Sequence, residues 1–95
     1  MKRQFVVVVN DESALVVNAT VERLNKFPGV KWSHYMKGLW QIVDTSGALT
    51  AAKLRVGIRE ALPDTMVIAF EITGESKWSG WVPVKMADWI ANNWE

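Results

Sequence analysis

The chain has 95 residues, of which 49% are apolar, and it balances 11 lysines and arginines against 10 aspartates and glutamates. This length predicts one domain over residues 1–95. The net charge of +1 does not favour nucleic acid as the main partner, because binding to a long phosphate backbone normally needs clustered positive charge. The lack of cysteine excludes a disulfide framework, a thiol nucleophile and a thiolate metal site.

No apolar run approaches the length of a membrane span, and we therefore expect no membrane contact. The basic start of the chain leads into an apolar run that is too short for a secretory signal and that ends at Asn10. We expect a cytoplasmic protein, made either by a bacterium or by a phage inside one.

Tryptophan is unusually abundant, with six residues in the chain and four of them among the last eighteen. Large rings compensate for a thin core because each buries a large area, and they are also favoured at interfaces. We therefore predict that packing and partner contact concentrate in the C-terminal segment. The binding and interface residues that we predict are Trp40, Trp78, Trp81, Trp89 and Trp94.

The first elements in the chain are predicted to be a buried strand and an amphipathic helix. Residues 5–9 form an unalternating apolar run that is typical of a central strand. Residues 13–26 repeat apolar side chains at helical spacing, and the Pro28-Gly29 pair ends this helix. The side chains expected on its inner face are Val17, Val21 and Leu24.

A hairpin is predicted next, because two strand-like stretches, residues 30–36 and 39–45, surround the short turn Lys37-Gly38. Polar and apolar side chains alternate in the first stretch. The alternation predicts one face made of Val30, Trp32, His34 and Met36.

The second half predicts a helix, a strand, a loop and a last helix. Thr50 is placed to cap the first of these helices, which Pro63 ends. Residues 65–73 predict the fourth strand, residues 74–81 a loop, and Pro83 suits the first turn of the last helix. The predicted inner faces are Ala51, Leu54, Ile58 and Leu62 in the earlier helix, and Met86, Trp89, Ile90 and Asn93 or Trp94 in the last.

This order of elements predicts an α+β fold, the ferredoxin-like βαββαβ sandwich with a four-stranded antiparallel sheet, plus a C-terminal helix. The first and third strands should lie in the centre of the sheet, with both long helices on one face. The other face then needs a cover, which either the tryptophan-rich tail or a second subunit supplies.

Five stretches carry a family resemblance. They are VVVVND (6–11), HYMKGLWQIVDT (34–45), LTAAKLRVGIREAL (49–62), DTMVIAFEITGESKWSGW (64–81) and DWIANNW (88–94). Through them, and over most of its length, the chain resembles a bacterial family of small proteins labelled SinR-like. That family in turn resembles the small ferredoxin-like subunit of the CRISPR-associated spacer-acquisition complex.

The resemblance implies a ferredoxin-like fold and a homodimer. In the spacer-acquisition relatives an aspartate closes the first strand, two such aspartates face each other across the dimer, and some members are described as metal-dependent nucleases. The matching residue is Asp11, which the resemblance makes a candidate catalytic residue and a ligand for Mg²⁺ or Mn²⁺; no other cofactor is implied. Asn10 stands where those relatives commonly have an aromatic residue.

The residues alone leave two interpretations of Asp11 open. A carboxylate at a strand end, doubled by two-fold symmetry, is suited to hold a divalent cation, with Glu12 assisting through water. Alternatively, Asp11 or Ser13 caps the first helix, which we favour because a single aspartate has little diagnostic value. His34, the only histidine, offers a general base, but we favour a packed side chain.

Two surface features complete the candidates. Five basic residues predict either a phosphate-contacting patch or, as we favour, a solvated face: Lys31, Lys37, Lys53, Arg55 and Arg59. Trp78 and Trp81 in the loop predict either anchors for a partner protein or packing within the core or a dimer.

The leading hypothesis is a small homodimeric binding or scaffold module that acts by contact with protein, or with nucleic acid, and not by catalysis. The second hypothesis is a metal-dependent endonuclease that uses Asp11 from both subunits at the dimer two-fold. The third is a phage or mobile-element protein that inhibits a host system.

Overall fold

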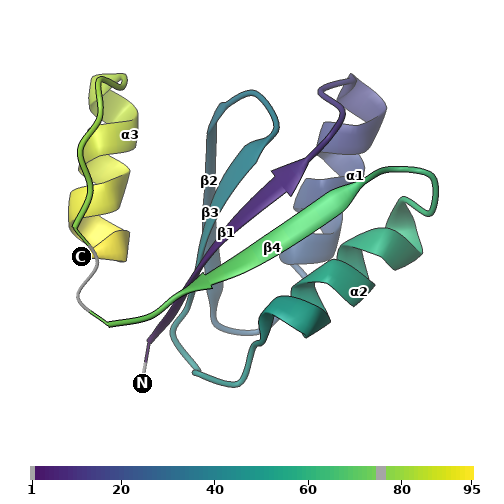
Figure 1. The fold of residues 1–95 in the computed structure, drawn as a ribbon, viewed down its shortest axis with the longest axis horizontal. Helices are drawn as coiled ribbons and strands as arrows, with labels where there is room; N and C mark the ends of the chain where they lie inside the picture. The colour runs from purple at the N-terminus through teal and green to yellow at the C-terminus, as the bar shows by residue number, and fades with distance from the viewer. Residues whose placement is uncertain (1, 75–76) are drawn as a thin grey trace.

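The computed structural model describes residues 2–74 and 77–95 and folds them into a four-stranded sheet with helices on both of its faces (Figure 1). The predicted order of elements is confirmed. No helix in these two ranges is both long and apolar enough to cross a membrane. The elements are β1 (Arg3–Val9), α1 (Ala14–Leu24), β2 (Val30–Met36), β3 (Leu39–Asp44), α2 (Ala51–Ala61), β4 (Val67–Ile72), α3 (Val84–Trp89) and η1 (Ile90–Trp94).

The loop predicted over residues 74–81 includes residues 75 and 76, which lie outside the described residues. Residues 77–83 form neither helix nor strand, which confirms the loop for that part. The C-terminal helix begins after Pro83 and continues from α3 into η1, a π-helical turn. The Glu95 N–H closes this turn by donating to the Ile90 carbonyl oxygen at 3.0 Å.

The strands lie in the order β2-β3-β1-β4, and all neighbouring strands are antiparallel. The first and third strands are therefore central, as predicted. Figure 1 shows α1 and α2 together on one face of the sheet and α3 on the other. This arrangement confirms the predicted α+β, ferredoxin-like sandwich with an added C-terminal helix.

The main core lies between the sheet and the helices α1 and α2. The odd-numbered side chains of β1 point into it, and Phe5 and Val7 are completely buried. Full burial of an aliphatic or aromatic side chain contributes roughly 1.5–3 kcal/mol. The even-numbered Val6 lies on the other face and is half-buried beneath the C-terminal helix. Because both faces of β1 are at least partly covered, its sequence is apolar without alternation.

The inner face of α1 is shifted by one position from the prediction at two of its three residues. The structure buries Val16, Thr20 and Leu24, whereas Val17 and Val21 are only partly buried at the margin of the core. Thr20 is tolerated there because its hydroxyl donates to the Val16 carbonyl oxygen at 2.8 Å. The predicted inner face of α2 is confirmed, with Leu54, Ile58 and Leu62 buried and Ala51 packed against them.

The alternation predicted for β2 is wrong at Met36. The pairing of β2 with β3 shifts between Ser33 and Met36, as at a β-bulge. Met36 consequently lies opposite Leu39 on the outer face of the sheet and is 49% exposed. His34 precedes the end of the shift and remains on the helix-covered face, against Trp40.

The C-terminal helix covers part of the other sheet face, which is one of the two covers that the sequence predicts. Met86, Ile90 and Trp94 form a second buried cluster with Val43 of β3. Lys2 fastens the end of the helix, since its Nζ donates to the carbonyl oxygens of Trp94 at 2.9 Å and of Glu95 at 3.0 Å. A cation at this position also interacts favourably with the helix dipole. The two chain termini accordingly lie near each other (Figure 1).

A buried carboxylate organises the turn after β3. Asp44 is 1% exposed, and it accepts hydrogen bonds from the Ser46 N–H at 2.9 Å, the Ser46 hydroxyl at 2.6 Å and the Leu49 N–H at 2.7 Å. Burial by itself raises the pKa of Asp44, but the hydrogen bonds outweigh burial and hold the pKa below its usual value. Asp44 therefore connects the end of β3 to the start of α2.

We expect Asp44→Asn to lower the free energy of unfolding by about 1–3 kcal/mol at pH 7, because the amide group leaves a buried N–H without an acceptor. The folded pKa is depressed, so the carboxylate stabilises the fold above the unfolded pKa of about 3.9 and loses this effect as the pH falls through the folded pKa. Urea unfolding at pH 7 and pH 3 measures this difference. The exposed Asp64→Asn is the control, and a deficit that is equally large at pH 3 would contradict the assignment.

Candidate functional site

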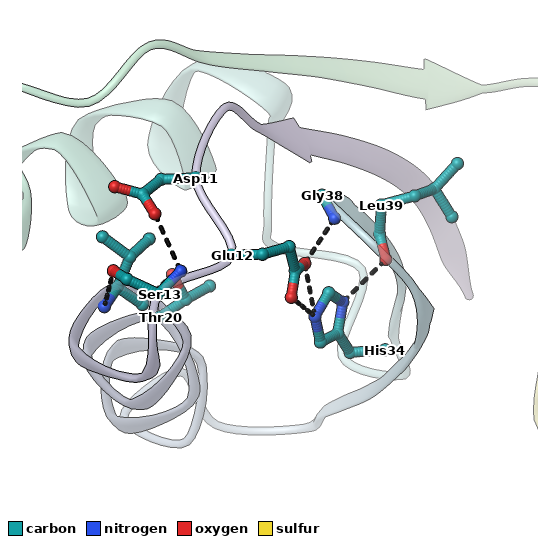
Figure 2. A network of polar contacts seen from close by, with 8 residues as sticks. Asp11, Glu12, Ser13, Thr20, His34, Gly38 and Leu39 are labelled. Carbon is teal, nitrogen blue, oxygen red and sulfur yellow. Dashed lines mark hydrogen bonds and ion pairs between the residues drawn. The ribbon is translucent and has the colours of Figure 1, made fainter.

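The candidate catalytic residue Asp11 lies in the turn between β1 and α1 (Figure 2). Its Oδ1 accepts a hydrogen bond from the Ser13 N–H at 2.8 Å. Ser13 is the N-cap residue of α1, and its hydroxyl faces the Val16 N–H at 3.4 Å. Asp11 therefore shapes the turn and Ser13 caps the helix, which agrees with the structural interpretation of the sequence.

Glu12 and His34 form a contact that joins the end of β1 to the β2–β3 hairpin (Figure 2). The two carboxylate oxygens of Glu12 lie 2.8 and 3.2 Å from His34 Nε2. The same carboxylate accepts a hydrogen bond from the Gly38 N–H. On the other side of the ring, His34 Nδ1 lies 2.9 Å from the Leu39 carbonyl oxygen. The His34 ring also stacks on Trp40, with centroids 3.8 Å apart and planes 6° from parallel.

Both nitrogens of His34 are thus engaged by oxygen acceptors of the chain itself. His34 Nδ1 faces the Leu39 carbonyl oxygen and Nε2 faces the Glu12 carboxylate, so groups of the chain occupy both sides of the ring. A general base needs a free nitrogen within reach of a substrate proton. We conclude that His34 is a packed residue that holds the hairpin, as the sequence favours.

Gly38 is required at the tip of this hairpin for two reasons. Its φ is +74°, in the left-handed region that favours glycine, and a Cβ would lie 3.0 Å from the Val9 carbonyl oxygen. The hydrogen bond from the Gly38 N–H is also the main reason why the pKa of Glu12 lies below its usual value. Burial raises this pKa by less, and His34 makes a smaller contribution that lowers it. Glu12 is therefore committed to the hairpin as an ionised acceptor.

The residues around Asp11 do not assemble a divalent-cation site within one protomer. Within residues 2–74 and 77–95, no three or more histidines, cysteines, aspartates or glutamates come together where they could hold a metal ion. The neighbouring carboxylate, Glu12, is already engaged by Gly38 and His34. Mg²⁺ requires near-ideal octahedral coordination by oxygen atoms, so the nuclease hypothesis depends on a second Asp11 from another copy.

A different candidate site is the part of the outer sheet face that the C-terminal helix leaves uncovered. We call it the open face and define it by Val8 of β1, Ile68 and Phe70 of β4, and Met66, which precedes β4. Val8 is 38% exposed, Ile68 51% and Phe70 52%. The register puts Val8 opposite Ile68, so these apolar side chains adjoin across two paired strands.

An open pocket of about 480 Å³ lies at one end of the open face. Val8, Met66 and Ile68 line it together with two arginines of α2, Arg55 and Arg59. Arg59 Nη1 donates to the Thr65 carbonyl oxygen at 2.9 Å. Neither arginine forms an ion pair with an acidic residue in the described part of the chain. The pocket therefore combines an apolar lining with two positive charges.

The predicted interface tryptophans fall into different environments. Trp40 is 1% exposed between the sheet and the long helices, so the prediction of an interface residue there is corrected to a core residue. Trp94 is buried in the second cluster, and Trp89 packs partly against that cluster. Trp78 is partly exposed and its Nε1 donates to Glu95 Oε1 at 3.0 Å. Trp81 is fully exposed and is available for partner contact.

Several important residues escape prediction from the sequence. The Glu12–His34 pair joins residues 22 positions apart, and no local pattern indicates it. Asp44, by contrast, has a sequence signal that could have identified it. Asp-x-Ser-Gly is a turn signature in which the aspartate bonds to the backbone two residues later. The alternation of β4 indicates a half-buried strand but does not reveal that its outer side chains lack a cover.

Comparison of the chain with models of protein families, with curated proteins and with solved structures found no match.

We expect Glu12→Gln to speed amide hydrogen exchange at Gly38 and to lower the thermal midpoint at pH 7, because the Gly38 N–H loses a charged acceptor. The folded pKa of Glu12 is lowered, so its contribution is complete above the unfolded pKa of about 4.3 and is lost as the pH falls through the folded value. The difference from the wild type should therefore shrink at pH 3. The exposed Glu22→Gln is the control, and unchanged Gly38 exchange at pH 7 would refute the contact.

We expect no Asp11-dependent cleavage when the protein is incubated with labelled RNA or DNA and Mg²⁺ or Mn²⁺. The reason is that one protomer offers a single aspartate where such a site needs converging oxygen ligands. Wild type and Asp11→Ala are compared on the same substrates by gel electrophoresis. Cleavage by the wild type that Asp11→Ala abolishes would show that Asp11 acts in catalysis.

Proposed function

We propose that this protein is a small homodimeric binding module that acts as a scaffold through contact with other proteins, and not through catalysis. The observation that carries the proposal is the half-covered outer face of the sheet. The C-terminal helix packs over Val43 and reaches Val6 and Ile72, whereas Ile68 and Phe70 in the same sheet stay about half exposed.

Exposure of this kind is uncommon for a surface without a partner. Isolated apolar side chains on a surface need no explanation, but contiguous apolar patches often mark sites of protein contact. The open face is contiguous, since Val8 lies opposite Ile68 in the adjacent strand and Ile68 and Phe70 are two positions apart on one face of β4. Its aromatic member, Phe70, is of a residue type enriched at interfaces.

The occupant that best fits the open face is an amphipathic helix of a partner protein. The chain already binds such a helix on the neighbouring part of the same face, where Met86, Ile90 and Trp94 point toward the sheet. A second helix beside it would place its own apolar row on Val8, Ile68 and Phe70. This mode of recognition, a helix laid into an apolar groove, is common among protein interfaces.

Trp81 supports the proposal from a different part of the chain. Its side chain is fully exposed on the segment before α3, and tryptophan is among the residues that most often dominate binding energy. Trp78, which is held by Glu95, lies three residues earlier and is partly exposed. We propose these two rings as a second contact area for the partner.

We expect Phe70→Ser to weaken binding of a labelled synthetic amphipathic helix, built from Leu, Glu and Lys, by roughly tenfold or more, which corresponds to about 1.4 kcal/mol or more. The helix would lose its aromatic anchor on the open face, whereas the core of the sheet would be unaffected. Fluorescence anisotropy measures the affinity.

Leu15→Ser is the matched control. Leu15 is 78% exposed in the first turn of α1, and α1 lies on the sheet face opposite the open face (Figure 1). The control should bind like the wild type, and circular dichroism checks that both variants are folded. Equal affinity of Phe70→Ser and the wild type, or an equal loss in both variants, would contradict the proposed surface.

A further inference from the structure

We propose that two copies of this chain pair through the free edges of β4, antiparallel and centred on Ala69, with Glu71 of each copy facing Arg55 and Arg59 of the other. The proposal rests on the proposed function in one respect, since it specifies how the homodimer forms. It names the strand, the register and the charged residues of the contact.

The two edges of the sheet differ in how well they are protected against pairing. β2 and β4 are the edge strands. β2 carries Lys31 and the bulge between Ser33 and Met36, which are features that natural sheets use to block edge-to-edge pairing. β4 has neither proline nor lysine nor a break in its pairing with β1. An unprotected edge strand is a ready template for another strand, so β4 is the edge available to a second copy.

Hydrogen-bond directions show which groups of β4 are free. Val9 N–H donates to the Gly38 carbonyl oxygen, and Asn10 N–H donates to the Met66 carbonyl oxygen. Even-numbered residues of β1 therefore direct their backbone groups toward β4. Their partners in β4 are also even-numbered, for example Val8 opposite Ile68. The odd-numbered residues of β4 consequently point their N–H and C=O groups away from β1: Val67, Ala69 and Glu71.

One register pairs all three of these residues at once. When Ala69 lies opposite Ala69 of the second copy, Val67 lies opposite Glu71. Each of these is then a hydrogen-bonded pair, because the free backbone groups belong to the odd-numbered residues. Ile68 falls opposite Phe70 on the outer face, where side chains in such non-hydrogen-bonded pairs approach closely. A two-fold axis through this point makes the contact self-complementary.

Charge complementarity selects the same register. Glu71 of the second copy would lie opposite Val67, and residues directly opposite in antiparallel strands share one face of the sheet. Val67 lines the pocket that contains Arg55 and Arg59. Glu71 is bound to Arg3 of its own chain at 2.6 and 2.9 Å, and a carboxylate has further lone pairs that can accept from a second guanidinium.

This pairing also fixes where the two copies of Asp11 lie. Asn10 bonds to Met66, so Asp11 is close to the beginning of β4. In the proposed register Met66 lies opposite Ile72 of the second copy, so the two strand beginnings are six residues apart, which is about 20 Å at 3.3 Å per residue. The two aspartates would not share a metal ion. The two open faces, by contrast, would join into one apolar surface across the two-fold.

The first test replaces Ala69 by proline. Because the Ala69 N–H points away from β1, Ala69→Pro leaves the β1 ladder intact but removes the central hydrogen bond of the dimer. Light scattering at high micromolar concentration should give a dimer for the wild type and a monomer for Ala69→Pro. Ala69→Ser keeps the N–H and should remain dimeric. A dimeric, folded Ala69→Pro would overturn the edge pairing.

A charge-exchange experiment keeps the proposal testable if Ala69→Pro fails to fold. The double variant Arg55→Glu/Arg59→Glu should be monomeric, and so should Glu71→Lys, because like charges then face each other. Mixed together, the two should form a heterodimer, since each acidic group again meets a basic one; native mass spectrometry detects it. Lys53→Glu/Lys85→Glu changes the charge equally at positions outside the contact and should stay dimeric. Absence of the heterodimer, or dimers of both separate variants, would refute the charge pairing.

The outcomes separate this inference from the proposed function. A dimer that survives both Ala69→Pro and the charge variants refutes the β4 contact but leaves the homodimeric module in place. A wild-type monomer refutes the β4 contact and the homodimer together. Equal helix affinity of Phe70→Ser and the wild type refutes the helix-binding surface, whereas the edge pairing is decided only by Ala69→Pro and the charge variants.

Discussion

The fold depends on the burial of β1, the central strand that is paired on both edges and flanked by helices on both faces. Phe5 and Val7 are fully buried on one side, and Val6 is covered in part by the C-terminal helix on the other. A chain of this length buries a modest fraction of its surface, so one such strand supplies a large share of the available core. The two faces are nevertheless covered unequally. Two long helices lie on one face, whereas a single short helix lies on part of the other (Figure 1), and the binding surface is a consequence of that inequality.

The polar residues at the end of β1 hold the turn into α1 and the β2–β3 hairpin together within one protomer. Asp11 closes the turn into α1 by accepting from the Ser13 N–H, and Glu12 joins that turn to the hairpin through Gly38 and His34. These contacts hold the beginning of β4 indirectly, because Asn10 of the same turn bonds to Met66. The polar corner therefore helps to position the strand that we propose as the dimer edge. The polar residues themselves lie outside the proposed dimer contact and act on it only through the position of β4.

Much of the architecture could be predicted from the sequence, because it depends on local periodicity. The unalternating run in β1 indicated a central strand covered on at least one face, and Leu54 and Ile58 marked the inner face of α2. Prediction was wrong where a tertiary contact overrides the pattern. Thr20 lies in the core because its hydroxyl is satisfied within its own helix, which hydrophobic periodicity cannot register. The β2 bulge moves Met36 to the other face without a sequence signal. The candidate site was harder still, because the exposure of Phe70 depends on where the C-terminal helix packs. Burial of this kind is set by tertiary contacts and not by local propensity.

The central claim is that β4 presents a free edge and an uncovered apolar face for assembly. Amide hydrogen exchange measured residue by residue at low and high protein concentration tests it directly. The Ile68 and Phe70 amides face β1 and should be protected at every concentration, whereas those of Val67, Ala69 and Glu71 should exchange rapidly in dilute solution and become protected as the concentration rises. Rapid exchange of those three amides at all concentrations, or protection that appears instead along β2, would contradict it.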